Sequence, residues 1–413
     1  MNVEILSIGD ELLLGQTIDT NSTHIAQKLC EIGLIPKYKS TTGDNVEEIE
    51  SAMKLAVKRA GLVITSGGLG PTDDDNTLKA IVKLFQRRLI LDNDLLENIR
   101  ARYKKRGIEM PAINENQALI PSGCHIFKNR IGSAVGIGIV EKNFILIALP
   151  GVPLEMKTVL DEEVIPFLTA KNFKHPIAIT TIKTIGIIES QMAELIAPDL
   201  KLEAGVKLAY LPGYSGVDLR VVATGDNEET AVEKAAKVIM YIEKKIGTCV
   251  YGRDDETLSS VVGQILRDND KKLATAESCT GGELGQLITA VPGASDYYLG
   301  GVVVYANDIK TIQLGVSPET IERYGAVSEQ CAVEMADGCI KKFNSDYALS
   351  ITGIAGPDGG TPEKPVGTTY IGLSSNQTSY ARHYNFGTER ESVRTRACFA
   401  ALELLRREIQ NLK

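Results

Sequence analysis

The chain repeatedly places a short apolar run directly before a glycine-rich turn and a segment with helical spacing. In the first third, residues 3–8 and 62–65 are such runs, followed by Gly9-Asp10-Glu11 and by the loop 66–77. Strands that alternate with helices are typical of right-handed crossovers and a parallel sheet. Ligands of such sheets bind at the carboxyl ends of the strands. We therefore expect a binding site where these two turns meet.

Length and changes of pattern predict several domains. The chain has 413 residues, which at roughly 100–200 residues per domain corresponds to about two to four domains. A polar joint before Pro176 and a new strand–helix series after residue 250 favour three domains, 1–170, 171–250 and 251–413. We expect an α/β fold with a mainly parallel sheet in the first domain, a small α+β middle domain and an α/β last domain.

Composition excludes several classes of protein. Hydrophobic residues make up 43% and charged residues 24% of the chain, the balance of a globular protein rather than a disordered one. The net charge of −8 makes a nucleic-acid partner unlikely. No apolar run approaches the roughly 18 residues of a membrane span, and the start resembles no signal peptide. Seven cysteines without a CxxC pair fit a reducing cytoplasm, so we expect a cytoplasmic protein.

The spacing of apolar residues predicts individual elements. Near the start, a helix is expected from about Asn21, a good capping residue, to Gly33, followed by a strand over 34–38 and a helix over 47–60. The other predicted helices are 151–170, 188–197, 227–245, 255–269, 283–290, 328–342 and 389–410. The other predicted strands are 177–185, 205–211, 217–224, 272–275, 300–305 and 347–351, with a hairpin over 366–386.

The loop SGGLGPTDDDNT at 66–77 indicates phosphate chemistry. Gly67, Gly68 and Gly70 would let backbone N–H groups approach a phosphate or a pterin-like ligand. The run Asp73-Asp74-Asp75 then places carboxylates at the start of a helix, which favours a hard divalent cation with oxygen ligands. The alternative is a solvated, acid-rich helix start. The glycine spacing matches neither a Walker loop nor a Rossmann fingerprint.

A second glycine pattern, Gly213-Tyr214-Ser215-Gly216, lies in the middle domain. It matches the GxxG of an RNA-binding KH module. However, a KH GxxG joins two helices, whereas this one joins two predicted strands. We therefore expect a β-hairpin turn.

The stretch TAESCTGG at 275–282 follows a strand and opens a helix. This arrangement exposes a hydroxyl or thiol beside N–H groups that could hold an oxyanion. Ser278 and Cys279 are rival nucleophiles; a tight turn and a buried thiol are the plainer alternatives. Because His383 is the only histidine in the last third, Lys310 is the better candidate base for Ser278, with Tyr305 as a proton relay or substrate contact.

The first domain resembles the N-terminal domain of the competence/damage-inducible protein A (CinA) family, which has a molybdopterin-binding fold. The resemblance rests on GDELLLGQTIDTNS at 9–22, TTGDN at 41–45, the loop at 66–77 and LPGVPLEM at 149–156. It implies a three-layer domain that hydrolyses ADP-ribose to AMP and ribose 5-phosphate with Mg, Mn or Co. The positions it implies as metal ligands are Asp10, Glu11, Asp44, Asp73, Asp74 and Asp75. The positions it implies in substrate binding are Asn21, Gly67, Gly68 and Gly70.

The middle domain resembles the KH-like linker of the same family, and the last domain resembles its C-terminal nicotinamide mononucleotide (NMN) amidohydrolase. The motifs of the last domain are TAESCTGG, VVVYANDIK, GAVSE, ITGIAGPDGG, KPVGT and FGTERESVR. The resemblance implies a metal-free deamidase that converts NMN to nicotinate mononucleotide and ammonia. It makes Ser278 the nucleophile, Lys310 the base and Tyr305 its partner. The implied substrate contacts are Thr352, Arg390, Gly281, Gly282 and Gly353.

Two classes of function remain open from the sequence. The first is a bifunctional bacterial enzyme of pyridine-nucleotide salvage, acting on NMN and ADP-ribose and expected to be a homodimer. The second is a pterin- or nucleotide-binding protein that acts in competence or DNA-damage responses without catalysis. The complete set Ser278, Tyr305, Lys310 and Thr352 favours the enzyme.

Overall fold

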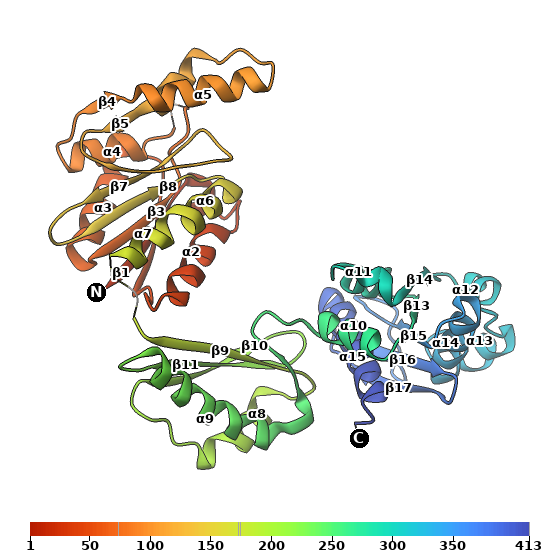
Figure 1. The fold of residues 1–413 in the computed structure, drawn as a ribbon. Coiled ribbons are helices and arrows are strands. Elements are labelled where there is room, and N and C mark those ends of the chain that lie inside the picture. Colours follow the sequence, from red (N-terminus) through yellow and green to blue (C-terminus); the bar gives the residue numbers. More distant parts are fainter. Residues whose placement is uncertain (73, 172, 174, 413) are drawn as a thin grey trace. The chain divides into compact units, whose positions relative to one another are not determined.

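The structure is a computed structural model that describes residues 1–72, 74–171, 173 and 175–412. The chain divides into two compact units, Met1–Ile177 with Asp226–Glu228, and Ala178–Gly225 with Glu229–Lys413. Each unit is described by itself below (Figure 1). Within the described chain, no helix combines the length and the apolarity needed to cross a bilayer.

The first unit is built on a six-stranded sheet of order β2-β1-β3-β8-β7-β6. The pairs β1–β2, β1–β3 and β3–β8 are parallel, whereas β7–β8 and β6–β7 are antiparallel. The sheet is therefore mainly parallel, as the sequence predicts. Its strands are β1 (Val3–Ile8), β2 (Tyr38–Thr42), β3 (Leu62–Ser66), β6 (His125–Phe127), β7 (Gly136–Val140) and β8 (Ile145–Leu149).

Apolar helix faces cover both sides of this sheet and make three layers. One buried cluster joins the sheet to α2 (Thr20–Glu31) and to the segment that runs through α6 (Pro153–Val159) and α7 (Ile165–Ala170). The other joins it to α3 (Val46–Arg59) and α4 (Thr77–Leu84). The predicted three-layer α/β fold is confirmed. The remaining elements are α1 (Asp10–Leu13), β4 (Leu89–Leu91), α5 (Asn93–Lys105), a 3-10 helix (Ala112–Ala118), β5 (Leu119–Pro121) and a π-helical turn (Leu160–Val164).

Two predictions for the first unit are wrong in detail. The strand predicted over 34–38 does not form, and only its last residue, Tyr38, lies in a strand, as the first residue of β2. Leu34 is buried in the core, but Ile35 is exposed and Pro36 lacks an N–H, so pairing with β1 begins at Tyr38. Helix α2 begins before Asn21, and its cap is Asp19, whose carboxylate accepts a hydrogen bond from the Ser22 N–H at 2.9 Å. Asn21 is thereby free for another role.

The second unit begins with an antiparallel sheet of order β10-β11-β9-β12. Gly213 donates its N–H to the Gly216 carbonyl at 2.8 Å, so GYSG closes the hairpin between β10 and β11 as predicted. The elements are β9 (Ile177–Thr184), α8 (Glu189–Ile196), a 3-10 turn (Ala197–Asp199), β10 (Val206–Pro212), β11 (Val217–Thr224), α9 (Glu228–Ile246), a 3-10 turn (Gly247–Cys249) and β12 (Val250–Arg253).

The rest of the second unit carries a five-stranded sheet of order β14-β13-β15-β16-β17. Strand β13 is parallel to both β14 and β15, and β16 and β17 form the predicted antiparallel hairpin. The strands are β13 (Leu273–Glu277), β14 (Tyr298–Val303), β15 (Tyr347–Gly353), β16 (Thr368–Ser375) and β17 (Ser379–Asn385). The helices are α10 (Leu258–Asp268), α11 (Glu283–Thr289), a 3-10 turn (Ala294–Asp296), α12 (Asn307–Leu314), α13 (Pro318–Tyr324), α14 (Glu329–Phe343) and α15 (Arg390–Ile409).

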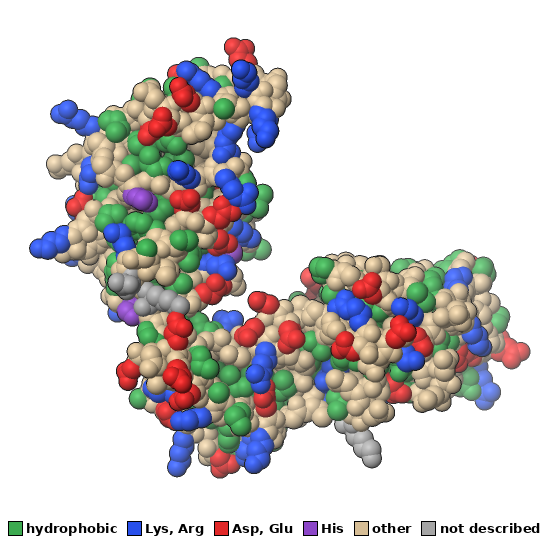
Figure 2. All heavy atoms as spheres, in the orientation of Figure 1, with side chains coloured by type: hydrophobic (Ala, Val, Ile, Leu, Met, Phe, Trp, Pro, Cys, Tyr) green, Lys and Arg blue, Asp and Glu red, His purple; other side chains and the backbone are tan. Residues whose placement is uncertain are grey.

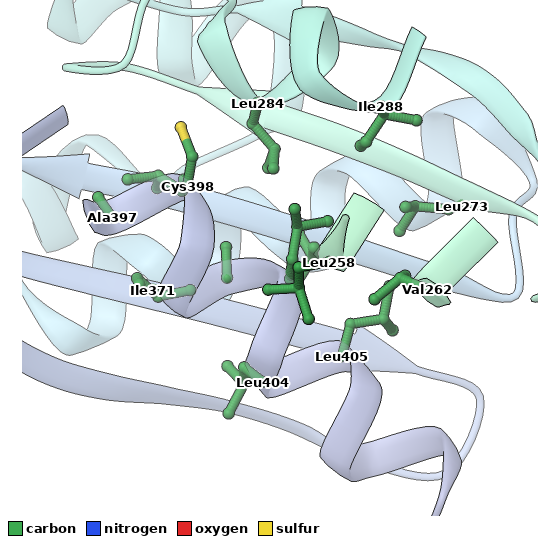
Figure 3. Close-up of a cluster of buried hydrophobic side chains, with 14 of the residues drawn as sticks. Leu258, Val262, Leu273, Leu284, Ile288, Ile371, Ala397, Cys398, Leu404 and Leu405 are labelled. Atoms are coloured by element: carbon green, nitrogen blue, oxygen red, sulfur yellow. The ribbon is translucent and has the colours of Figure 1, made fainter. Parts of the chain in front are cut away.

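A continuous core holds this sheet against its helices. Figure 3 shows Leu258 and Val262 of α10 facing Leu405 of α15, with Leu284 of α11 directed into the same cluster. The beginnings of α11 and α15 are thus anchored beside the end of β13. On the face shown in Figure 2, basic and acidic side chains are interspersed rather than gathered by sign.

Candidate active sites

A cleft of about 390 Å³ lies at the carboxyl ends of the parallel strands of the first unit. It is where the turn after β1 and the glycine loop after β3 were expected to meet. Several predicted residues line it together: Glu11, Asn21, Asp44, Gly67, Gly68, Asp74 and Asp75. Asp10 and Gly70 are not part of the lining, but each hydrogen-bonds to a residue that is.

Asn21 presents an unused acceptor to this cleft. Its amide nitrogen donates to Ser66 Oγ at 3.0 Å and to the Gly151 carbonyl at 2.7 Å. Its amide oxygen is buried and has no hydrogen-bond partner among the described residues. Because a buried acceptor without a partner is costly, this oxygen is well suited to a ligand hydroxyl or N–H group.

Asp10 and Asp44 are held side by side by reciprocal hydrogen bonds. The Asp10 N–H donates to Asp44 Oδ2 at 2.9 Å, and the Asp44 N–H donates to Asp10 Oδ1 at 3.2 Å. Each carboxylate keeps its second oxygen for another partner. Across the described residues, however, no three His, Cys, Asp or Glu side chains gather in a group that could hold a metal.

Asp75 has a role that its spacing did not predict. Its Oδ1 accepts from the Gly70 N–H at 2.7 Å, and its Oδ2 accepts from the N–H and the hydroxyl of Thr72 at 2.9 and 2.5 Å. A side chain on Gly70 would meet the same carboxylate at 2.4 Å. Asp75 therefore holds the glycine loop in shape. Asp73, the first acid of the predicted run, lies outside the described residues.

In the second unit, Ser278 and Lys310 meet at the end of β13. Lys310 Nζ lies 3.1 Å from Ser278 Oγ, and Lys310 as a residue is 1% exposed. It also donates to the backbone carbonyls of Val304 at 2.9 Å and Tyr305 at 3.1 Å. Burial lowers the pKa of Lys310 below its ordinary value of 10.5, because the charged ammonium loses hydration.

Three further predicted residues lie around this pair. Thr352, at the end of the neighbouring β15, is buried and donates its hydroxyl to the Ala326 carbonyl at 2.7 Å. Arg390 donates to the Gly356 carbonyl at 2.5 Å and to the Tyr305 hydroxyl at 3.3 Å. Tyr305 thus touches Lys310 through its backbone carbonyl, while its exposed ring reaches Arg390.

The sequence predicts that N–H groups at the start of α11 are free to hold an oxyanion, but two of them are already occupied. Gly281 donates to the Ser278 carbonyl, and Gly282 donates to the Glu277 carboxylate. Their φ angles of +61° and +100° explain the two glycines. Among the described residues, the N–H groups of Cys279 and Thr280 donate to no carbonyl or side chain, so these two are the candidate donors beside Ser278.

Cys279 is surrounded differently from Ser278. It is 6% exposed, and a side chain on Gly353 would lie 3.2 Å from its sulfur. Burial raises the pKa of the Cys279 thiol to about 11, and the Glu277 carboxylate adds to that rise. A reactive cysteine needs the opposite shift.

Sequence reasoning missed one residue near the start of α11, which is Arg394. A hollow of about 710 Å³ lies over the start of α11 and α15, lined by Gly281, Gly282, Arg390 and Arg394 among others. Arg394 donates to the Thr280 carbonyl at 2.8 Å and pairs with Glu283 at 3.3 Å. Neither Ser278 nor Lys310 is among the residues that line this hollow. The spacing of Arg390 and Arg394 by one helical turn is the signal that could have found Arg394.

Three family models match the chain in order. They are described as a probable molybdopterin binding domain over residues 4–170, a damage-inducible protein CinA KH domain over 180–252 and a CinA C-terminal domain over 255–409. A CinA-like protein of Gemmatimonas aurantiaca is 41% identical over 98% of this chain and 96% of its own. A putative competence-damage inducible protein of Caldicellulosiruptor saccharolyticus is 39% identical over the full length of both.

Solved structures resemble parts of the chain. A competence/damage inducible protein of Agrobacterium tumefaciens is 34% identical, with a TM-score of 0.36 over 37% of this chain and 93% of its own. A CinA superfamily protein of Escherichia coli is 37% identical, with a TM-score of 0.35 over 36% of this chain and 87% of its own.

Proposed function

The chain belongs to the CinA family, and we propose that it is a bifunctional hydrolase of pyridine nucleotides. Its second unit removes the carboxamide nitrogen of NMN, and its first unit cleaves the pyrophosphate of ADP-ribose. The observation that carries the proposal is the 3.1 Å contact between Ser278 Oγ and the buried amine of Lys310.

The surroundings of Lys310 suit a base. The carbonyls of Val304 and Tyr305 accept two of its hydrogens. In the neutral amine, the lone pair then faces Ser278. Burial favours that neutral form. Lys310 takes the Ser278 proton as Oγ forms a bond to the carboxamide carbon, and the same proton passes to the nitrogen, which leaves as ammonia. Water then cleaves the acyl-enzyme to nicotinate mononucleotide and restores Ser278.

The remaining groups suit the two ends of NMN. The Thr352 hydroxyl already donates its hydrogen to the Ala326 carbonyl, so its oxygen can only accept a further hydrogen bond. Such an acceptor matches the N–H donors of a carboxamide. The N–H groups of Cys279 and Thr280 are the candidate donors for the oxyanion. Arg390, with Arg394 one turn further along α15, supplies guanidinium groups for the phosphate.

The cleft of the first unit suits a nucleotide diphosphate. The glycine loop exposes backbone beside carboxylates, and the buried acceptor of Asn21 fits a ribose hydroxyl or a base N–H. Asp10 and Asp44 fit a Mg²⁺-type cation, because Mg²⁺ is usually held by one or two carboxylates together with substrate phosphates and water. When bound, such an ion neutralises the pyrophosphate and lowers the pKa of a water molecule.

One experiment tests both activities. The full chain is incubated with NMN and with ADP-ribose, with and without EDTA, and the products are identified. We expect ammonia release from NMN to survive chelation and ADP-ribose hydrolysis to stop. If EDTA abolished both, the metal-free serine mechanism would be wrong. If neither substrate were consumed with added metal, the chain would be a binding protein instead. We also propose that the protein is cytoplasmic and forms a homodimer.

A further inference from the structure

The carboxylate of Glu277, directly before the nucleophile, is buried under the turn that carries Ser278. Glu277 is the last residue of β13 and is 2% exposed. Its Oε2 accepts from the N–H groups of Gly282 at 3.0 Å and Leu284 at 3.1 Å, and its Oε1 accepts from the Gly285 N–H at 2.8 Å. A carboxylate at the end of a fully buried strand is unusual, and these three bonds are what balance its burial.

The three bonds tie the start of α11, where the turn ends, to the last residue of strand β13. The backbone of Ser278 itself donates to the Ile351 carbonyl of β15 at 3.0 Å. With Gly282, Leu284 and Gly285 tied to Glu277, the residues between Ser278 and α11 have little freedom. The position of Ser278 Oγ relative to Lys310 then depends on this carboxylate, although Glu277 itself has no hydrogen bond to either residue.

The same bonds decide which N–H groups face a substrate. Without Glu277, the N–H groups at the start of α11 would compete with those of Cys279 and Thr280 for the developing oxyanion. A misplacement of about 1 Å at a reacting centre can cost on the order of 10²-fold in rate.

We propose that Glu277 is a positioning residue for the amidohydrolase, whose buried carboxylate fixes the nucleophile turn and occupies the N–H groups at the start of α11, which leaves those of Cys279 and Thr280 for the oxyanion. This inference rests on the proposed function of the second unit. It adds a residue that touches neither the substrate nor the reacting atoms and acts only through the backbone of the turn.

The test compares Glu277→Gln with a matched variant in the same full chain. Glu334 is the control, because its carboxylate also accepts hydrogen bonds at the start of a helix, from the Ser317 N–H at 2.7 Å and the Thr320 hydroxyl at 2.6 Å. Steady-state deamidation of NMN, the melting temperature and the rate at which a fluorophosphonate labels Ser278 are measured for both. The fluorophosphonate bonds to Oγ and releases fluoride, so it reports the serine without NMN.

We expect Glu277→Gln to lower kcat by about 10²-fold with KM for NMN nearly unchanged, and to slow labelling of Ser278 to a similar extent. Glu334→Gln, whose melting temperature is measured alongside, should change neither. A kcat that falls only in proportion to the folded fraction would overturn the inference.

If Glu277→Gln does not fold, Glu277→Asp takes its place; full kcat in that folded variant would also overturn the inference. A wild-type chain that is labelled at Ser278 but releases no ammonia would refute the proposed activity, and the labelling rates would still test Glu277.

Discussion

Ser278 and Cys279 are neighbours in the chain but have different surroundings. Ser278 contacts the Lys310 amine, whereas burial and Glu277 keep Cys279 as a thiol. We expect Ser278→Ala to lose ammonia release from saturating NMN by a factor on the order of 10³ or more. Cys279→Ala should keep most of the activity. The opposite pattern, or inactivation by iodoacetamide that maps to Cys279 and is blocked by NMN, would make the enzyme a thiol amidohydrolase.

The protonation of Lys310 predicts how deamidation depends on pH. Only the neutral amine can take the Ser278 proton, so the rate should rise with pH as Lys310 loses its proton. Because burial lowers the pKa, the midpoint of this rise should lie below the ordinary value of 10.5. A pH–rate profile of kcat/KM measures it. Lys310→Arg stays protonated and should be inactive across the range; a variant with the same ascending limb would exclude Lys310 as the base.

At the scale of elements, the glycine loop between β3 and α4 depends on Asp75. Asp75→Ala removes the acceptors of Gly70 and Thr72, so the loop should lose its shape. We expect ADP-ribose hydrolysis to fall by at least an order of magnitude, while Asp75→Asn, which keeps one acceptor oxygen, retains more. Product analysis with added metal measures both variants. Full activity in Asp75→Ala would make this acid part of a solvated surface.

The cap of helix α2 makes a prediction about stability. Burial works to raise the pKa of Asp19, but hydrogen bonds from Ser22 and Ser7 outweigh it and hold the pKa below the ordinary 3.8. Asp19→Ala should cost about 1 kcal/mol, or about 2–4 °C of melting temperature at pH 7. Since the pKa of Asp19 is depressed in the folded state, the difference in melting temperature between the wild type and Asp19→Ala should shrink as the pH falls through that pKa. Circular dichroism at pH 7 and about pH 3 measures this difference, with the exposed Asp255→Ala as control. A difference of the same size at low pH would contradict a role for the Asp19 charge.

At the scale of the whole molecule, the two sites belong to separate compact units. Distant sites without shared partners usually behave additively. Asp44→Ala should therefore abolish metal-dependent ADP-ribose hydrolysis and leave NMN deamidation within about twofold of the wild type. Both activities are assayed in the same preparation. Loss of deamidation in a folded Asp44→Ala chain would show that the two units are coupled.

Much of the fold could be predicted because local patterns agree with it. Apolar periodicity located β1, α3, β13 and α15 nearly to their ends, and the glycines after β3 and β13 marked the turns that carry the candidate residues. The prediction failed at 34–38, where an apolar pair looked like a strand. There the polar strand β2 occupies the sheet edge by pairing with β1, and it contains Tyr38, Thr41 and Thr42, which are residue types favoured in strands.

The sequence by itself determined the order of strands and helices, the three family-like segments and the residue types able to carry out the chemistry. Tertiary structure alone decided which of these residues meet. Ser278 and Lys310 are 32 residues apart and touch only because β13 and β14 are parallel neighbours. Asp19 rather than Asn21 caps α2, and Glu277 faces three N–H groups instead of solvent. Spacing along the chain fixes which face of an element a side chain occupies, whereas contacts between elements depend on packing that no local pattern contains.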